Sequence, residues 1–150
     1  MLPAHEKKFL HALLLTGAEY DAIQKLRAKF NSFEAAWRAE PAALTAAGLS
    51  AELAAKIAVT HSRLNPDDEM RKLVASRIAI VAADDGEFPA ELLQIASPPV
   101  AIYIKGRIRK DLPHLAVVGT RKATAYGREA ARKIIRELAL KTDIAIVVNR

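Results

Sequence analysis

The chain has 150 residues, 51% of them hydrophobic, and a formal net charge of +6, which excludes a disordered tail and favours a polyanionic partner. Charged residues interrupt every apolar run before it reaches the roughly 20 residues of a membrane span, and the first residues lack the apolar core of a secretory signal. The absence of cysteine excludes disulfides and thiolate metal sites and favours a cytoplasmic location.

The first 75 residues are predicted to form a helical domain. Gly17 is expected to end the first helix, Ser32 and Ser50 are suited to cap later helices, and Pro41 is suited to a first helical position. Apolar residues at helical spacing predict a core up to about residue 64, packed independently of any sheet, from Leu13, Ile23, Leu26, Trp37, Leu44, Leu53 and Ile57.

Residues 44–57 are similar to a helix-hairpin-helix, in which a glycine turn lets backbone N–H groups meet a DNA phosphate. Ser50 replaces the usual second glycine of that turn. A structural bundle of the SAM type is therefore favoured over direct DNA contact, and both interpretations stay open. Phe30, Phe33 and Trp37 lie at positions more typical of a core than of a base-stacking surface.

Residues 76–150 are predicted to form a second domain that contains strands. A helix from Pro66 to about Ala75 precedes the β-branched run 78–81, which is followed by Asp84-Asp85-Gly86. That sequence favours a solvated turn over a carboxylate pair. A second strand is expected at 100–104.

The last third of the chain has the pattern strand, glycine turn, helix, strand. The strands are expected at 115–118 and 144–148 and the helix at 125–140, which predicts a βαβ unit of a parallel sheet. The chain is therefore predicted to be an α/β protein that begins with a helical bundle.

Cations gather around the predicted glycine turn. From Lys105 to Glu137 there are ten Lys or Arg against three acidic residues, Asp111, Glu129 and Glu137. A turn before a helix offers free backbone N–H groups and the positive end of the helix dipole, so a phosphate fits there beside Arg121 or Lys122. The turn lacks both the G-x-G-x-x-G and the P-loop patterns. Phosphate binding and an ordinary basic loop are equally compatible with this spacing.

Three linked motifs identify a family resemblance. The run VVGTRKATAYG at 117–127 resembles a hallmark G-[ST]-R-x-A-[ST]-x-Y-G, residues 84–89 resemble its D-x-x-Y/F-P turn, and residues 97–106 resemble its P-P-x-x-L-Y-x-x-G strand. Together they resemble the N-terminal half of the DNA processing protein A (DprA, or Smf) family. The family pattern continues beyond Arg150.

The resemblance implies an incomplete Rossmann-like domain at 76–150 and a SAM or helix-hairpin-helix-like domain at 1–75. It implies single-stranded DNA binding in natural transformation (competence) and recombination, with RecA recombinase as partner and homodimers in full-length members. Arg121 matches the pocket arginine, and Lys122 is a weaker candidate. The full set of DNA- or phosphate-binding residues implied in this way is Gly119, Thr120, Arg121, Lys122, Tyr126 and Gly127.

No catalytic, metal or cofactor site is predicted. The four histidines are scattered, and no serine has a recognisable partner base. Tyr103 and Tyr126 are the aromatic residues of the basic half best placed for a ligand, although Tyr126 is favoured to staple its helix to the sheet. Two alternatives remain: a nucleotide-binding enzyme or sensor resembling the LOG-like phosphoribohydrolases, and an inactive truncated remnant.

Overall fold

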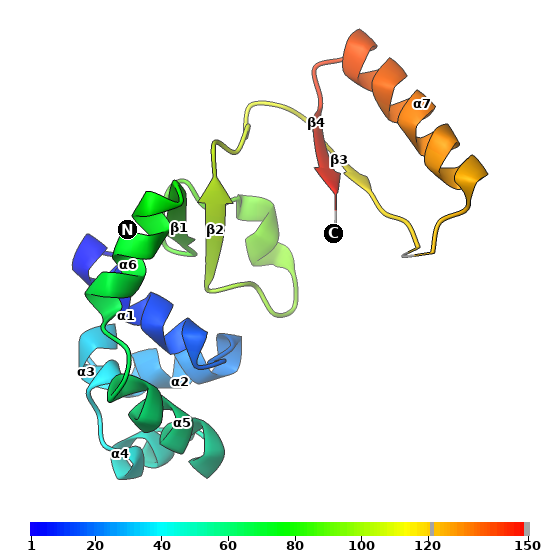
Figure 1. The fold of residues 1–150 in the computed structure, drawn as a ribbon. Coiled ribbons are helices and arrows are strands. Elements are labelled where there is room, and N and C mark those ends of the chain that lie inside the picture. The colour runs from blue at the N-terminus through cyan, green and yellow to red at the C-terminus, as the bar shows by residue number, and fades with distance from the viewer. Residues whose placement is uncertain (121, 149–150) are drawn as a thin grey trace. The chain divides into compact units, whose positions relative to one another are not determined.

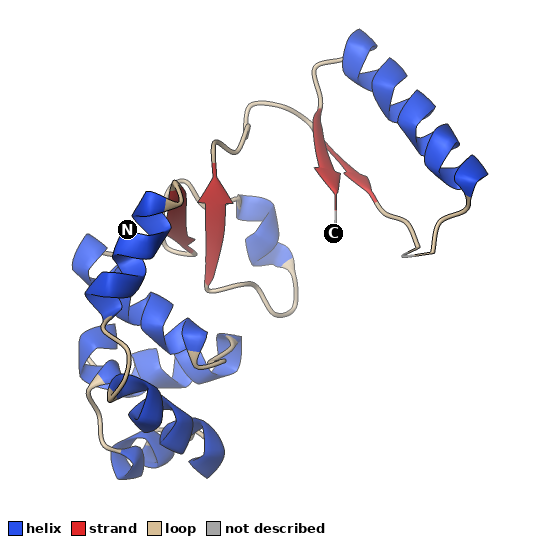
Figure 2. Ribbon diagram, in the orientation of Figure 1, coloured by secondary structure: helices blue, strands red, loops and turns tan. Residues whose placement is uncertain are grey.

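The chain is a mixed α/β protein, and its computed structural model describes residues 1–120 and 122–148. Six helices precede the first strand, and a long helix lies between the last two strands (Figures 1 and 2). In chain order the elements are α1 (Ala4–Leu15), α2 (Tyr20–Lys29), α3 (Phe33–Trp37), α4 (Pro41–Ala46), α5 (Ala51–His61), α6 (Pro66–Ala75), β1 (Ile78–Ala82), the 3-10 helix η1 (Ala90–Gln94), β2 (Ala101–Lys105), β3 (His114–Val117), α7 (Ala125–Lys141) and β4 (Ala145–Val148).

The four strands form two separate pairs within the described part of the chain. β3 and β4 run parallel, with Leu115 opposite Ile146, as expected of the βαβ unit that contains α7. β1 and β2 run antiparallel, with Ile80 opposite Tyr103. A parallel sheet was predicted for residues 76–150. The prediction is confirmed for β3 and β4 and is wrong for β1 and β2, which pair antiparallel. The turn and short 3-10 helix between β1 and β2 let the chain reverse direction.

Contacts divide the chain into two compact units, residues 1–107 and residues 108–150. The predicted boundary between residues 75 and 76 stays a prediction, because compact units need not coincide with the domains of a family. Every helix in the described ranges is too short or too polar to cross a membrane.

Local sequence signals set the ends of the early helices as predicted. Ser32 accepts a hydrogen bond from the Ala35 N–H, and Ser50 accepts one from the Leu53 N–H, so each caps the helix that follows. Gly17 and Gly48 follow α1 and α4 with φ values of +85° and +92°, a region that glycine enters without steric cost.

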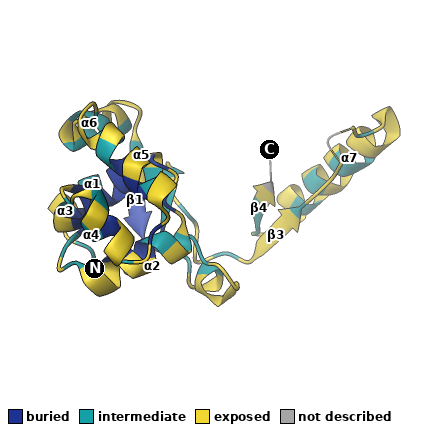
Figure 3. Cartoon of the chain, turned by 90° about the horizontal axis from the view of Figure 1, so that it is seen from below, coloured by how far each residue is buried: buried dark blue, intermediate teal, exposed yellow. Residues whose placement is uncertain are grey.

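Helices α1 to α5 share one apolar core, whose buried residues are dark blue in Figure 3. Six predicted core residues are at most 2% exposed: Leu13, Ile23, Leu26, Trp37, Leu44 and Ile57. Leu53 packs half-buried against them. Ala82 of β1 and Val100, just before β2, belong to the same cluster. The predicted helical core is confirmed, but it does not pack independently of the sheet, because Ala82 of β1 and Val100 beside β2 belong to it.

The turn after β1 is held by a buried carboxylate. Asp85 is 4% exposed and accepts hydrogen bonds from the backbone N–H of Leu2 at 3.0 Å and of Ala82 at 2.9 Å. The Lys7 ammonium lies 2.6 Å from Asp85 Oδ2. The prediction of a solvated Asp-Asp-Gly turn is wrong for Asp85, which anchors the start of α1 to β1. The prediction holds better for Asp84, because this side chain forms an exposed ion pair with Arg27.

The second unit has no comparable core. None of its described residues from 108 to 147 is buried, and β3 and α7 are coloured exposed or intermediate throughout Figure 3. Leu115 and Val117 of β3 and Ile134 of α7 keep part of their apolar surface in solvent.

Candidate nucleic-acid interface

The predicted anion site lies in the connection from β3 to α7. Thr124 is the N-cap of α7, and its Oγ1 accepts a hydrogen bond from the Gly127 N–H at 3.0 Å. A Cβ at Gly127 would lie 3.3 Å from that hydroxyl, which is a tight contact. Gly127 therefore leaves room for the cap that starts α7, a role that its place in the sequence motif does not reveal.

Gly119, Thr120 and Lys122, in the turn before this cap, are open to solvent. Apart from its chain neighbours, no described residue has an atom within 4 Å of the place where a Cβ of Gly119 would lie, so a ligand can approach its backbone. Thr120 Oγ1 accepts a hydrogen bond from the Lys122 N–H at 3.2 Å, and the Lys122 side chain is exposed. Arg121, the predicted pocket arginine, lies outside the described residues. The turn thus presents one described cation beside an accessible backbone.

Tyr126 does not staple α7 to the sheet. Its side chain is 84% exposed in the first turn of the helix, so the packing role favoured from the sequence is wrong. An exposed tyrosine close to cationic residues can offer its ring face to a nucleic-acid base.

Tyr103, the other candidate aromatic residue, has a structural partner. Its hydroxyl and His11 Nδ1 lie 2.7 Å apart in a hydrogen bond, and the two rings meet edge to face with centroids 5.4 Å apart. Burial raises the pKa of Tyr103. Burial also lowers the pKa of His11, against a smaller opposing effect of Glu69. This pair joins β2 to α1 and lies outside the predicted anion site.

The net positive charge of the protein comes from the second unit. Residues 108–150 contain ten Lys or Arg and four Asp or Glu, and this excess of six positive charges equals the net charge of the whole chain. In residues 1–107 the numbers of positive and negative side chains are equal. In the first unit many cations pair with acids, as Lys8 does with Asp67 at 2.8 Å. This distribution favours an anionic ligand at the second unit.

The turn of the helix-hairpin-helix-like segment is already hydrogen-bonded. The Gly48 N–H donates to Thr45 O at 2.8 Å, and the Leu49 N–H donates to Leu44 O at 3.2 Å. The Lys25 ammonium donates to the carbonyl of Gly48 at 3.1 Å. Because these amides end α4, they are not free for a phosphate, which favours the structural interpretation of residues 44–57.

The described residues contain no group of three His, Asp or Glu side chains that could hold a metal ion. His11 bonds Tyr103, and the ring of His61 packs edge to face on Trp37 with centroids 5.4 Å apart. These two histidines therefore have structural contacts in the first unit.

Comparisons with known proteins agree with the motifs of this region. Residues 79–148 match the family of DNA recombination-mediator protein A. Protein Smf of Synechocystis sp. (strain ATCC 27184 / PCC 6803 / Kazusa) is 30% identical over 131 residues, which cover 83% of this chain. The chain spans about a third, 33%, of the length of that relative. No solved structure matches the chain significantly. The chain belongs to the DNA recombination-mediator protein A family, which includes the Smf proteins.

Proposed function

We propose that this chain binds single-stranded DNA without catalysis, as part of a recombination mediator. The observation that carries the proposal is the accessible, cation-bearing turn between β3 and the capped start of α7, in the unit that holds the net positive charge. The carboxyl end of a parallel strand is where open α/β sheets gather ligands, and a helix N-terminus favours an anion there.

In this proposal each residue of the site has a defined role. The backbone at Gly119 and the hydroxyl of Thr120 contact a phosphate, while Arg121 and Lys122 supply positive charge. Tyr126 stacks on a base, and Gly127 keeps the helix start compact.

We extend the proposal to the two predicted domains and to the protein partners. Residues 1–75 act as a SAM or helix-hairpin-helix-like bundle, and residues 76–150 begin a Rossmann-like domain. The protein takes part in loading RecA onto DNA in the cytoplasm during natural transformation and assembles as a homodimer. Family membership supports this role.

Replacing Arg121 and Lys122 together by glutamine should weaken binding to single-stranded oligonucleotides. Each lost phosphate contact removes about 0.7 from the slope of log affinity against log salt, which is roughly 4-fold in affinity at about 0.15 M salt. The double variant should therefore lose about 15-fold, by the same relation, in a fluorescence anisotropy titration. The sequence predicts a loop at both positions, so fold stability should change by less than about 0.5 kcal/mol.

The matched control is the double variant Lys29→Gln and Arg38→Gln, which removes the same charge from exposed positions in the first unit. It should bind almost as the unmodified chain does. If the Arg121 and Lys122 variant has the same affinity and the same salt slope as the unmodified chain, the turn does not bind DNA. Tight binding of a mononucleotide, with turnover, would favour the LOG-like alternative.

A further inference from the structure

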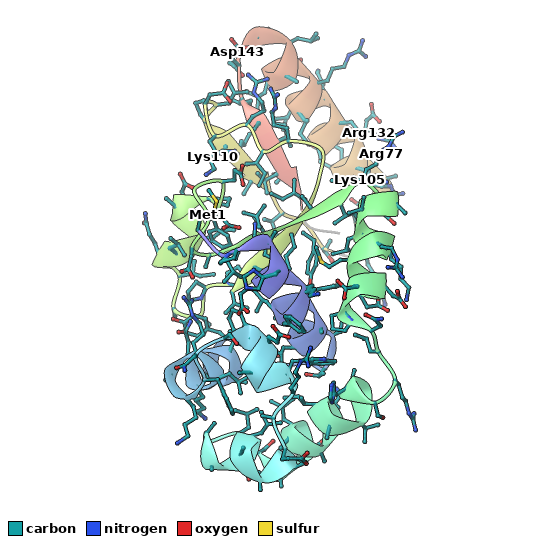
Figure 4. The ribbon with its side chains drawn as sticks, turned by 90° about the vertical axis from the view of Figure 1, so that its left-hand side faces the viewer. Met1, Arg77, Lys105, Lys110, Arg132 and Asp143 are labelled. Atoms are coloured by element: carbon teal, nitrogen blue, oxygen red, sulfur yellow. The ribbon has the colours of Figure 1, made fainter. Side chains whose placement is uncertain are left out.

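Helix α7 carries its arginines in one row. Arg128, Arg132 and Arg136 follow one another at intervals of four residues, so each lies about 6 Å further along the helix and is rotated by only about 40°. All three are exposed, and Figure 4 shows the side chain of Arg132 extending outward from α7. We call these three residues the arginine ladder.

Two guanidinium groups of the ladder are available to bind an anionic ligand. Neither Arg132 nor Arg136 has an ion pair or hydrogen bond with any residue in the described ranges, although Glu129 and Glu137 are on the same helix. Arg128 donates a hydrogen bond to the Ala123 carbonyl, so its guanidinium is held next to the turn of the proposed site. The ladder therefore extends from that turn along α7.

We propose that the arginine ladder binds phosphates along one nucleic-acid strand. This inference rests on the proposed function and adds a second contact surface to the turn. The ladder spans about 12 Å, which is between three and four of the ~3.4 Å axial steps along a strand of B-form DNA, so neighbouring arginines about 6 Å apart face phosphates roughly two steps apart. Arginine suits the task because its planar guanidinium can donate two parallel hydrogen bonds to one phosphate.

The geometry favours a nucleic acid over an anionic membrane. A helix that lies on a bilayer must insert its apolar face, with bulky aromatic residues often at the boundary. In α7 the apolar residues Ala131, Ile135 and Leu138 are half-buried within their own unit, while Ile134 and Leu140 are exposed. Apart from Tyr126 in its first turn, the helix therefore offers a bilayer only two large aliphatic side chains, and it has no Trp or Phe. The arginines can therefore meet a ligand while the apolar face stays covered in part.

The test is a triple variant of the complete chain, with Arg128, Arg132 and Arg136 replaced by glutamine. Glutamine keeps the helix propensity and removes three charges. With oligothymidylates of about 4 and about 16 nucleotides as probes, the salt slope should fall by about 2, and affinity for the longer probe should fall roughly 50-fold at about 0.15 M salt. Far-ultraviolet circular dichroism should show unchanged helix content.

The matched control removes three charges from exposed positions of the first unit, by Lys29→Gln, Arg38→Gln and Arg71→Gln. An equal loss of affinity in this control would overturn the ladder in favour of net charge alone. Unchanged affinity in the ladder variant would overturn the ladder while leaving the proposed function intact. An unmodified chain that binds no oligonucleotide would overturn both, and ladder-dependent binding to anionic vesicles but not to oligothymidylate would assign the surface to membranes.

Discussion

Trp37→Ala is expected to lower the free energy of unfolding by about 3–5 kcal/mol, the largest effect of any single change considered for this chain. The Trp37 side chain is 2% exposed and lies at the end of α3, where its ring meets the ring of His61 edge to face. Alanine would remove that aromatic contact and leave a cavity between α3 and α5. A small domain has only about 5–15 kcal/mol of stability, so the loss is severe.

Urea unfolding followed by far-ultraviolet circular dichroism measures this loss, because the variant lacks the only tryptophan that fluorescence could report. Trp37→Phe should retain much of the stability, since an aromatic ring still fills the site. Val74→Ala is the matched control, since Val74 is 71% exposed and its replacement should cost less than about 0.5 kcal/mol. A urea midpoint for Trp37→Ala equal to that of the unmodified chain would contradict the burial of Trp37 in this core.

Asp85→Asn is expected to cost about 3 kcal/mol at neutral pH. The substitution keeps the size of the side chain but leaves the Lys7 ammonium without its counter-charge and turns an amide donor toward groups that are themselves donors. The figure is at the lower end of the ~3–5 kcal/mol range for a broken buried pair, because Lys7 is partly accessible to water.

The effect of Asp85→Asn should depend on pH in a defined direction. Burial by itself raises the pKa of Asp85, but hydrogen bonds from Lys7, Ala82 and Leu2 and the charge of Lys7 outweigh it and lower the pKa. A lowered pKa in the folded chain gives stability that is present above the unfolded value of about 3.9 and is lost as pH falls through the folded value. The difference between the unmodified chain and Asp85→Asn should therefore shrink below about pH 4.

Urea midpoints of both proteins at neutral and acidic pH check this linkage. The double variant Lys7→Met and Asp85→Asn should be less destabilised than the sum of its two single variants, because the two groups interact directly. Additive single effects, or a difference that is constant with pH, would contradict the buried pair.

The early helices could be read from the sequence because their signals are local. Ser32 and Ser50 cap the helices that they precede, and Gly48 follows a helix with a positive φ, all within a few residues of the groups they contact. Trp37 lies in the core, as its helical spacing predicts, because short amphipathic helices gain stability only by burying their apolar faces.

Long-range contacts could not be read in the same way. Asp85 has the local sequence of a solvated turn, and its burial depends on Leu2 and Lys7, some 80 residues away in the chain. The antiparallel pairing of β1 with β2 likewise depends on how the connection folds back, which hydrophobic patterns do not specify. From the sequence, Tyr103 was a candidate for ligand contact, because its hydrogen-bond partner His11 lies 92 residues earlier in the chain and no local pattern links the two.

The candidate site was predictable as a segment but not in its detail. The glycine turn and the cations before α7 are visible as a motif, whereas the exposure of Tyr126 and the packing of Gly127 on the Thr124 hydroxyl depend on side-chain geometry. The four-residue spacing of the arginine ladder is visible in the sequence, but an ordinary solvated helix face has the same spacing.

A binding titration of the unmodified chain tests the central claim most directly. The probes are a single-stranded oligonucleotide of about 4 nucleotides, one of about 16 nucleotides, a duplex and a mononucleotide, each at about 50 and about 200 mM salt. A single-strand binder with contacts at the turn and along α7 should prefer the longer single strand, weaken steeply with salt and bind the mononucleotide poorly. Affinity independent of length and salt, or tighter binding of the mononucleotide than of the longer strand, would contradict a single-stranded DNA site in this chain.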